Sequence, residues 1–155
     1  MDSVDAQWKD SMDDYNVMLV TIGRSSTENG TYLPGVDGVD ASQDLNQTDP
    51  LGLSDDERDL INAAVEAKKN NGGKVIVMLN NSNAMEIDEI KNNDGVDAIL
   101  EVGFPGGYGF YGVADILSGE ANPSGHLTDT YAVTNANSPA AQNLETMSGQ
   151  MQIRL

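Results

Sequence analysis

The sequence predicts an α/β fold, a three-layer α/β/α sandwich with a mostly parallel sheet. Two observations carry this prediction. Short apolar runs alternate along the chain with segments whose apolar residues recur every three or four positions, which is the pattern of strands joined by crossover helices. The apolar runs are also nearly continuous, as in strands that are covered on both faces.

Three segments are expected to form the strands. They are residues 17–22, residues 74–79, which repeat the same apolar pattern, and residues 98–102, in which the pattern is weaker. Parallel strands that follow one another need right-handed crossovers between them. Because three strands make a thin sheet for this class, we expect further strands in the segment 25–53 or the tail, or a part of the domain outside this chain.

The first helix is expected after Ser54. The motif Ser54-Asp-Asp-Glu57 has the spacing of a capping box, and acidic side chains in a first turn are favoured by the helix dipole. Lys68-Lys69 followed by Gly72-Gly73 predicts its end. Its inward face is expected to consist of the residues that recur at helical spacing, Leu60, Ile61, Ala64 and Val65.

Two further helices are expected. Asn83-Ala-Met-Glu86 reads as a second cap, from which a helix would run to a stop at Gly95. The last helix is expected over residues 108–117. Its inward residues would be Phe110, Val113, Ala114 and Leu117.

We expect residues 1–155 to form one domain, with an α/β core over about 15–132 and a tail or linker over 133–155. The segment 25–53 lacks periodicity and is longer than the roughly 15 residues beyond which loops in compact domains are usually functional or disordered. It leaves the carboxyl end of the first strand, where open α/β sheets bind their ligands. The ligand site is therefore expected there.

Composition narrows the possible partners. Eight basic and 25 acidic residues give a net charge of −17, and this excess of negative charge repels nucleic acids and anionic membranes. There is no cysteine, and the longest apolar run is far shorter than the roughly 20 residues of a membrane span. The first residues lack the order of a signal peptide, and both a cytoplasmic and an exported protein would fit the sequence.

Glu28 is the candidate catalytic residue, because it follows the first strand within the long segment. A carboxylic acid in a partly enclosed site can acquire a raised pKa and protonate a leaving oxygen. The alternative is a loop glutamate in water. Mechanisms that use a carboxylic acid and a carboxylate nucleophile together also need the second carboxylate roughly 5 Å from the acid. Asp37, Asp40 and Asp44 lie in the same segment, but their spacing does not pair any of them with Glu28.

No cofactor or metal is expected. The glycine-rich residues 103–109 can present backbone N–H groups to an anion, but a tight turn explains the glycines, and no Lys or Arg lies nearby. His126 is the only histidine, and a lone histidine makes a poor metal site. The acids between Asp37 and Asp44 miss the ligand order of a calcium loop.

Several segments together resemble the α/β sandwich domain of family 3 glycoside hydrolases. They cover about residues 15–132, and their order and rough spacing agree with the family. The residues that carry the resemblance are Val17-Met-Leu-Val-Thr-Ile-Gly-Arg24, Leu53-Ser-Asp-Asp-Glu-Arg-Asp-Leu60, Lys74-Val-Ile-Val-Met-Leu-Asn80, Phe104-Pro-Gly-Gly107 and the closing motif Gly119-Glu-Ala-Asn-Pro-Ser-Gly-His-Leu-Thr-Asp129.

The resemblance implies part of a retaining β-glycosidase, similar to a β-glucosidase, that acts on a carbohydrate substrate. It implies that Glu28 is the acid/base, and that the nucleophile belongs to a barrel domain of the same full-length protein. That barrel and the first strand-helix unit of the sandwich are absent from this chain, so we expect the chain alone to be inactive. Thr27 stands where members often have glycine, and Asn29-Gly-Thr replaces their aspartate-arginine pair.

Two alternatives belong to other classes. One is a non-catalytic α/β module whose segment 25–53 binds carbohydrate or a protein, since a fold alone does not separate binding from catalysis. The other is a nucleotide or phosphate site at residues 103–109, which the charge of −17 disfavours.

Overall fold

The computed structural model describes residues 11–24, 49 and 51–138. The elements alternate along the chain as the sequence predicts. They are η1 (Met12–Asp14), β1 (Val17–Gly23), α2 (Asp55–Asn71), β2 (Lys74–Asn80), α3 (Asp88–Lys91), β3 (Ala98–Glu101), α4 (Gly106–Ser118) and η4 (Asn135–Asn137).

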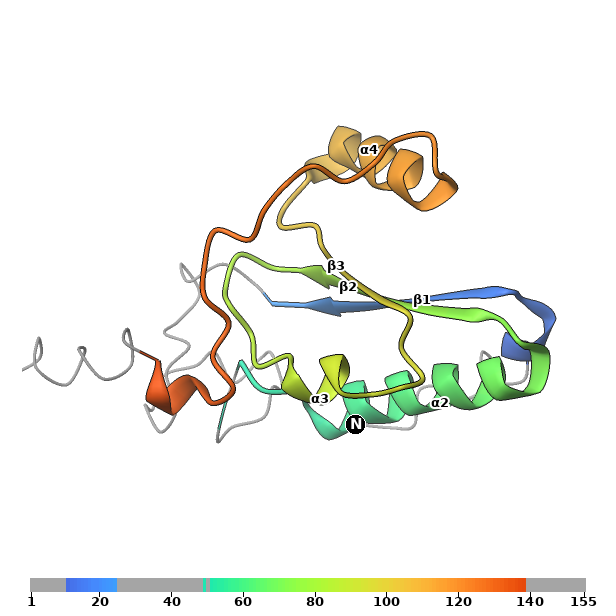
Figure 1. Cartoon of the computed structure of the whole chain (residues 1–155), viewed down its shortest axis with the longest axis horizontal. Coiled ribbons are helices and arrows are strands. Elements are labelled where there is room, and N and C mark those ends of the chain that lie inside the picture. The colour runs from blue at the N-terminus through green and yellow to red at the C-terminus, as the bar shows by residue number, and fades with distance from the viewer. Residues whose placement is uncertain (1–10, 25–48, 50, 139–155) are drawn as a thin grey trace, which may run out of the picture.

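The predicted α/β class and parallel sheet are confirmed. The strands pair in the order β1-β2-β3, and both pairings are parallel. Helices α2 and α3 lie on one face of the sheet and α4 lies on the other (Figure 1). Within the part of the chain that the structure describes, this sheet has three strands.

The hydrophobic core lies between the sheet and the layer formed by α2 and α3. Because side chains alternate along a strand, every second residue of β1 and β2 points into this core. Helix α2 supplies the opposing apolar side chains. The buried members are Met18, Val20, Ile22, Leu53, Ile61, Ala64, Ala67, Val75, Val77, Leu79, Met85 and Ile90.

Helix α2 begins and ends as predicted. The Ser54 side chain accepts a hydrogen bond from the Glu57 backbone N–H, and the Glu57 side chain accepts one from the Ser54 backbone N–H. The cap therefore satisfies two backbone donors that the helix itself leaves free. At the other end Gly72 takes the left-handed conformation, with φ +72°, which glycine adopts without the steric cost of a Cβ.

The predicted cap at Asn83 is wrong. Helix α3 begins only at Asp88 and has no side-chain cap. The Asn83 backbone N–H instead donates to the Asn81 side chain, 3.0 Å away. The Glu86 backbone N–H donates to the Leu51 carbonyl at 3.0 Å. Such bonds compete with helical ones, so the residues before Asp88 are held by other segments instead of by a helix.

The face of the sheet on which α4 lies is only partly covered by the described residues. Two predictions are therefore wrong: the inward face of α4 and the coverage of β1 on both sides. In α4 only Val113 of the predicted inward residues is buried, whereas Phe110 is 44% exposed and Ala114 is exposed. In β1 the side chains that face this layer are open, with Val17 50% and Leu19 47% exposed. The described residues thus bury one face of β1 and leave its other face accessible.

After α4 the chain turns back across the sheet. Gly119, at φ +82°, ends the helix, and residues 119–134 then run past the carboxyl ends of the strands to η4 on the opposite side (Figure 1). We call residues 119–134 the closing segment. They contain the closing motif, which is one of the segments that carry the family resemblance, and beyond that motif Tyr131 meets the end of β3 at the carboxyl edge.

Candidate active site

The candidate site is the carboxyl edge of the sheet. Because the three strands are parallel, they all end at this edge, at Gly23, Asn80 and Glu101. Two of these end residues carry polar side chains, and Arg24 and Asn81 follow directly, both buried, at 3% and 1% exposure. A sheet edge of this kind brings together polar groups that are far apart in the sequence.

Arg24 joins the two ends of the long segment. Its Nη1 and Nη2 atoms donate to the Glu57 carboxylate at 2.5 and 2.9 Å, and Nη2 also donates to the Gly52 carbonyl at 2.8 Å. The Arg24 side chain is 0% exposed and that of Glu57 is 17% exposed. Since Arg24 precedes residues 25–48 and Gly52 follows them, this bidentate ion pair fixes both ends of that segment at the sheet edge.

Glu57 is held in its ionised form. Burial raises its pKa, but hydrogen bonds from the Arg24 guanidinium and the Ser54 backbone N–H outweigh burial, and the net pKa lies below the ordinary value. The same carboxylate therefore caps α2 and neutralises a fully buried cation. A paired and hydrogen-bonded carboxylate of this kind is a positioning group, because it has no proton to give.

Asp49 and Glu86 form a second acidic group beside this ion pair. The Asp49 carboxylate accepts hydrogen bonds from the backbone N–H groups of Leu51 and Gly52 at 3.1 and 3.2 Å. Burial and the neighbouring carboxyl groups of Asp49 and Glu89 raise the pKa of Glu86. A hydrogen bond from the Asn135 backbone N–H lowers it, but the net pKa lies above the ordinary value. The structure thus places a carboxyl with a raised pKa near Asp49, where the chain returns from the long segment.

Glu101 connects the closing segment to the sheet. One of its carboxylate oxygens accepts from the Gly103 backbone N–H at 2.9 Å, and the other accepts from the Tyr131 hydroxyl at 2.8 Å. The Asn80 amide donates to the Gly103 carbonyl at 2.5 Å. Burial and the Glu101 carboxylate raise the pKa of Tyr131. The phenol therefore stays protonated and keeps the closing segment attached at the end of β3.

The predicted acid/base Glu28 lies outside the described residues, and so do the other carboxylates considered in its segment, Asp37, Asp40 and Asp44. The structure shows that the strand before these residues and the helix after them are joined at Arg24.

The other predicted candidates lie within the described residues. Gly103 and Gly106 have positive φ values of +57° and +62°, which fits the tight-turn interpretation of residues 103–109. His126 is exposed in the closing segment. Among the residues that the structure describes, no three acidic, histidine or cysteine side chains gather as a metal site would require. None of the described helices has the length and apolar character needed to cross a membrane.

Sequence reasoning missed several residues that build this edge. Glu101, Tyr131 and Asn135 were not singled out, although a glutamate inside an apolar strand was a usable signal for the first of them. Nothing local indicates Asn135, which is 5% exposed and comes from the part of the chain predicted as tail. The side-chain Nδ2 atoms of Asn83 and Asn135 are buried and have no hydrogen-bond partner among the described residues.

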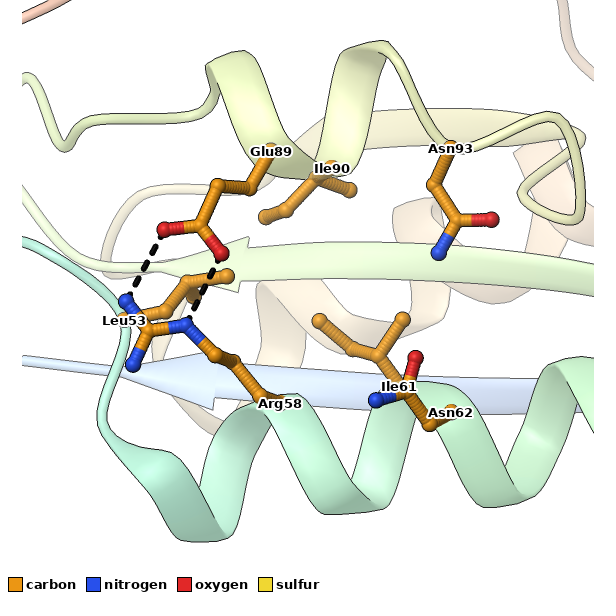
Figure 2. A pocket seen from close by; sticks show the side chains of 7 residues that line it. All are labelled: Leu53, Arg58, Ile61, Asn62, Glu89, Ile90 and Asn93. Atoms are coloured by element: carbon orange, nitrogen blue, oxygen red, sulfur yellow. Dashed lines mark hydrogen bonds and ion pairs between the residues drawn. The ribbon is translucent and has the colours of Figure 1, made fainter.

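A separate hollow lies between α2 and α3 (Figure 2). Figure 2 shows Arg58 and Glu89 joined at one end of the hollow and the amides of Asn62 and Asn93 at the other. The Arg58 Nε and Nη2 atoms donate to Glu89 at 2.8 and 2.9 Å. The apolar floor is formed by Leu53, Ile61 and Ile90, each at most 3% exposed. With so little apolar surface left open, the hollow is a helix-helix seam closed by an ion pair.

Comparison with known proteins gives a family match. The family model described as "Glycosyl hydrolase family 3 C-terminal domain" matches residues 2–152 of the chain.

Individual relatives agree with this match. The chain is 28% identical over 135 residues to thermostable β-glucosidase B of Acetivibrio thermocellus, covering 86% of the chain and 17% of the relative. It is 34% identical over 79 residues to β-xylosidase/α-L-arabinofuranosidase 1 of Medicago sativa subsp. varia, covering 51% of the chain and 10% of the relative. It is 29% identical over 131 residues to probable β-glucosidase F of Emericella nidulans, covering 84% and 14%. The matched regions thus span 10% to 17% of the lengths of these relatives.

Proposed function

Because the chain belongs to the glycosyl hydrolase family 3 C-terminal domain family, we propose that it is the part of a retaining β-glycosidase that supplies the acid/base. Its substrate is a β-glycoside, in keeping with relatives named β-glucosidase and β-xylosidase. Glu28 is the acid/base, and the nucleophile comes from a barrel domain of the same full-length protein.

The observation that carries this proposal is the anchorage at Arg24. Glu28 is four residues beyond Arg24, and the Arg24 side chain is fully buried against Glu57 and Gly52. A rigid base at a sheet edge limits where a nearby side chain can reach, and catalysis needs such restriction of geometry. The segment between Arg24 and Gly52 is long, but its two ends are fixed to each other. This supports a functional role for the segment.

The proposed reaction has two steps. Glu28 first protonates the glycosidic oxygen while the barrel carboxylate attacks the anomeric carbon, so that the leaving group departs as an alcohol and a glycosyl-enzyme ester forms. Glu28, now ionised, then removes a proton from water as that water attacks the ester carbon and releases the sugar. Each step transfers one proton through the same carboxyl, which returns to its starting state.

The test uses the full-length protein with Glu28→Ala. We expect turnover of an alkyl β-glycoside to fall by about 10²- to 10⁴-fold, because its poor leaving group needs the acid. An activated aryl β-glycoside should form the glycosyl-enzyme without the acid. Azide should then restore its turnover and yield a glycosyl azide, since azide attacks without a general base.

Matched variants decide the assignment. Asp37→Ala, in the same segment, is the control. We expect this variant to keep most of its activity and to show no stimulation by azide. If Glu28→Ala keeps normal activity and Asp37→Ala, Asp40→Ala or Asp44→Ala acquires the azide rescue, the acid/base is that other residue. If no variant responds to azide, the segment does not supply the acid/base.

The division of the site between two domains has its own test. The 155-residue chain alone is expected to show no hydrolysis of an aryl β-glucoside, because it lacks the proposed nucleophile. Hydrolysis by the isolated chain that disappears in Glu28→Gln would overturn the divided site.

A binding module without catalysis is the second candidate. It is favoured by Phe104, which is 54% exposed beside the end of β3. An exposed aromatic side chain suits the apolar face of a sugar ring. This candidate predicts oligosaccharide binding that survives Glu28→Ala and is weakened by Phe104→Ala.

A further inference from the structure

The turn between β3 and α4 presents an aromatic side chain at the carboxyl edge of the sheet. Phe104 lies in this turn, three residues after the end of β3, and is 54% exposed. Exposure alone does not separate a binding residue from an ordinary surface residue, because single apolar side chains are common on protein surfaces. Phe104 differs from such a residue in how firmly the backbone on both sides of it is held.

The backbone before Phe104 is held by the ends of two strands. The Gly103 N–H donates to the Glu101 carboxylate at 2.9 Å, and the Gly103 carbonyl accepts from the side-chain amide of Asn80 at 2.5 Å. Gly103 has φ +57°, a conformation that glycine adopts without the steric cost of a Cβ. The end residues of β2 and β3 therefore fix the direction in which the chain enters Phe104.

Pro105 restricts the backbone on the other side. A residue that precedes proline is largely excluded from the helical region, so Phe104 has few backbone conformations. The Pro105 carbonyl accepts from the Gly109 N–H at 3.1 Å, which attaches the turn to the first turn of α4. A Cβ on Gly106 or Gly107 would meet nothing within 4 Å. The turn is thus rigid, and the space at the two residues that follow Pro105 is open.

The segment around Phe104 favours a neutral ligand. Residues 102–114 contain no Asp, Glu, Lys or Arg, although the chain as a whole has a net charge of −17. Glu101 lies just before this segment, and its two carboxylate oxygens accept from Gly103 and Tyr131. A rigid aromatic side chain supplies a large contact area at a low cost in conformational entropy. An uncharged aromatic surface of this kind suits the apolar face of a sugar ring.

We propose that Phe104 is a specificity-determining residue that stacks on the sugar of the leaving group, and that Glu101 and Asn80 position it. This inference rests on the proposed function. In that reaction the acid and the nucleophile flank the scissile bond, so the leaving group lies on the side of the acid and away from the nucleophile. The acid/base segment leaves the carboxyl end of β1, and Phe104 follows the carboxyl end of β3 at the same edge of the sheet.

The test compares two substrates of the full-length protein that share the transferred sugar. They are cellobiose and methyl β-glucoside, or xylobiose and methyl β-xyloside, and only the disaccharide has a sugar as its leaving group. Phe104→Ala should lower the ratio of kcat/KM for the disaccharide to that for the methyl glycoside by about tenfold. Phe104→Trp should keep the ratio. Tyr111→Ala is the matched control, because Tyr111 is a 71% exposed aromatic residue of α4, and it should keep the ratio too.

Glu101 variants test the positioning role. Glu101→Ala removes the acceptor of the Gly103 N–H and should lower the same ratio by about threefold or more. Glu101→Gln keeps an acceptor oxygen and should restore the ratio. Circular dichroism shows whether each variant is folded. A folded Glu101→Ala variant with an unchanged ratio would contradict the positioning role.

The inference and the proposed function can fail separately. The inference is overturned if Phe104→Ala keeps the ratio, or if it lowers kcat/KM equally for both substrates, which would assign Phe104 to the fold or to a contact with the barrel. A normal azide response of Glu28→Ala beside an unchanged ratio in Phe104→Ala refutes this inference alone. A lowered ratio in Phe104→Ala without any azide response of Glu28→Ala supports the role of Phe104 and refutes Glu28 as the acid/base.

Discussion

Arg24 is the residue on which the candidate site depends most. Its guanidinium has no contact with solvent, and it bonds to the Glu57 carboxylate and the Gly52 carbonyl. A buried charge of this kind is costly unless it is paired and hydrogen-bonded. Its partners come from the helix and the turn that follow the long segment. The same contacts that satisfy the charge therefore determine where that segment starts and ends.

Arg24→Met should destabilise the chain by about 2–3 kcal/mol, because it leaves the largely buried Glu57 carboxylate unpaired. Urea unfolding followed by circular dichroism measures this loss. Arg58→Met is the matched control. Arg58 is 34% exposed and its partner Glu89 is 59% exposed, so solvent screens that pair and the loss should be about 0.5 kcal/mol. Equal losses in the two variants would contradict the role given to Arg24.

The stability of the chain should depend on pH through Glu57. Its folded pKa lies below the ordinary value of 4.5 because the Arg24 and Ser54 hydrogen bonds outweigh burial. The stabilisation is therefore present above about pH 4.5 and is lost as the pH falls through the folded pKa. The difference in unfolding free energy between wild type and Glu57→Gln should shrink as the pH is lowered from 7 to 3.

The stability of Glu86→Gln relative to wild type should depend on pH in the opposite direction to that of Glu57→Gln. Burial and neighbouring carboxyl groups raise the folded pKa of Glu86, so its contribution is full below the unfolded pKa and is lost as the pH rises through the folded one. This variant should gain stability relative to wild type as the pH rises. Profiles with the same sign of slope for Glu57→Gln and Glu86→Gln would contradict at least one of the two assignments.

At the scale of elements, α2 and α4 are both helices but are held in different ways. Helix α2 has a capping box and buries Ile61, Ala64 and Ala67. Helix α4 lacks a side-chain cap and buries only Val113, and its Tyr108 and Tyr111 are 90% and 71% exposed. Packing supplies most of the stability of a short helix, so α4 is the less stable of the two.

Glycine-to-alanine substitutions should separate structural glycines from dispensable ones. A Cβ on Gly95 would lie 2.2 Å from a Val65 methyl carbon of α2, whereas a Cβ on Gly112 of α4 meets nothing within 4 Å. Gly95→Ala should therefore destabilise the chain by about 1–3 kcal/mol through overpacking. Gly112→Ala should stabilise it by about 0.5–1 kcal/mol by restricting the unfolded chain.

Thermal unfolding measures both substitutions. Gly95→Ala should lower the midpoint and Gly112→Ala should raise it by a few degrees. A fall in midpoint for Gly112→Ala would mean that something outside the described residues approaches α4 closely at that position.

At the scale of the whole molecule, the closing segment joins parts that the sequence keeps apart. It leaves α4 on one side of the sheet, meets Glu101 through Tyr131, and leads on the other side to η4, whose Asn135 backbone N–H donates to Glu86 (Figure 1). The contact of the closing segment with Glu101 is a structural one, which agrees with a role in shaping the carboxyl edge.

The sequence by itself determined the class of fold, the three strands and the ends of α2. These features depend on local patterns: apolar runs, the spacing from Ser54 to Glu57, and a glycine that can take positive φ at position 72. It also carried the family assignment, which the family match over residues 2–152 confirms. Each of these signals lies within one short stretch of chain, so no contact between distant residues is needed to read it.

Only the tertiary structure decided which polar groups meet at the carboxyl edge. The bonds from Arg24 to Glu57, from Tyr131 to Glu101 and from Asn135 to Glu86 join residues 33, 30 and 49 positions apart. The structure also showed that Asn83 does not cap α3 and that the described residues leave the side chains on one face of β1 exposed. A buried polar group has several possible partners along the chain. Packing across the sheet, and not the local sequence, determines which of them comes within hydrogen-bonding distance.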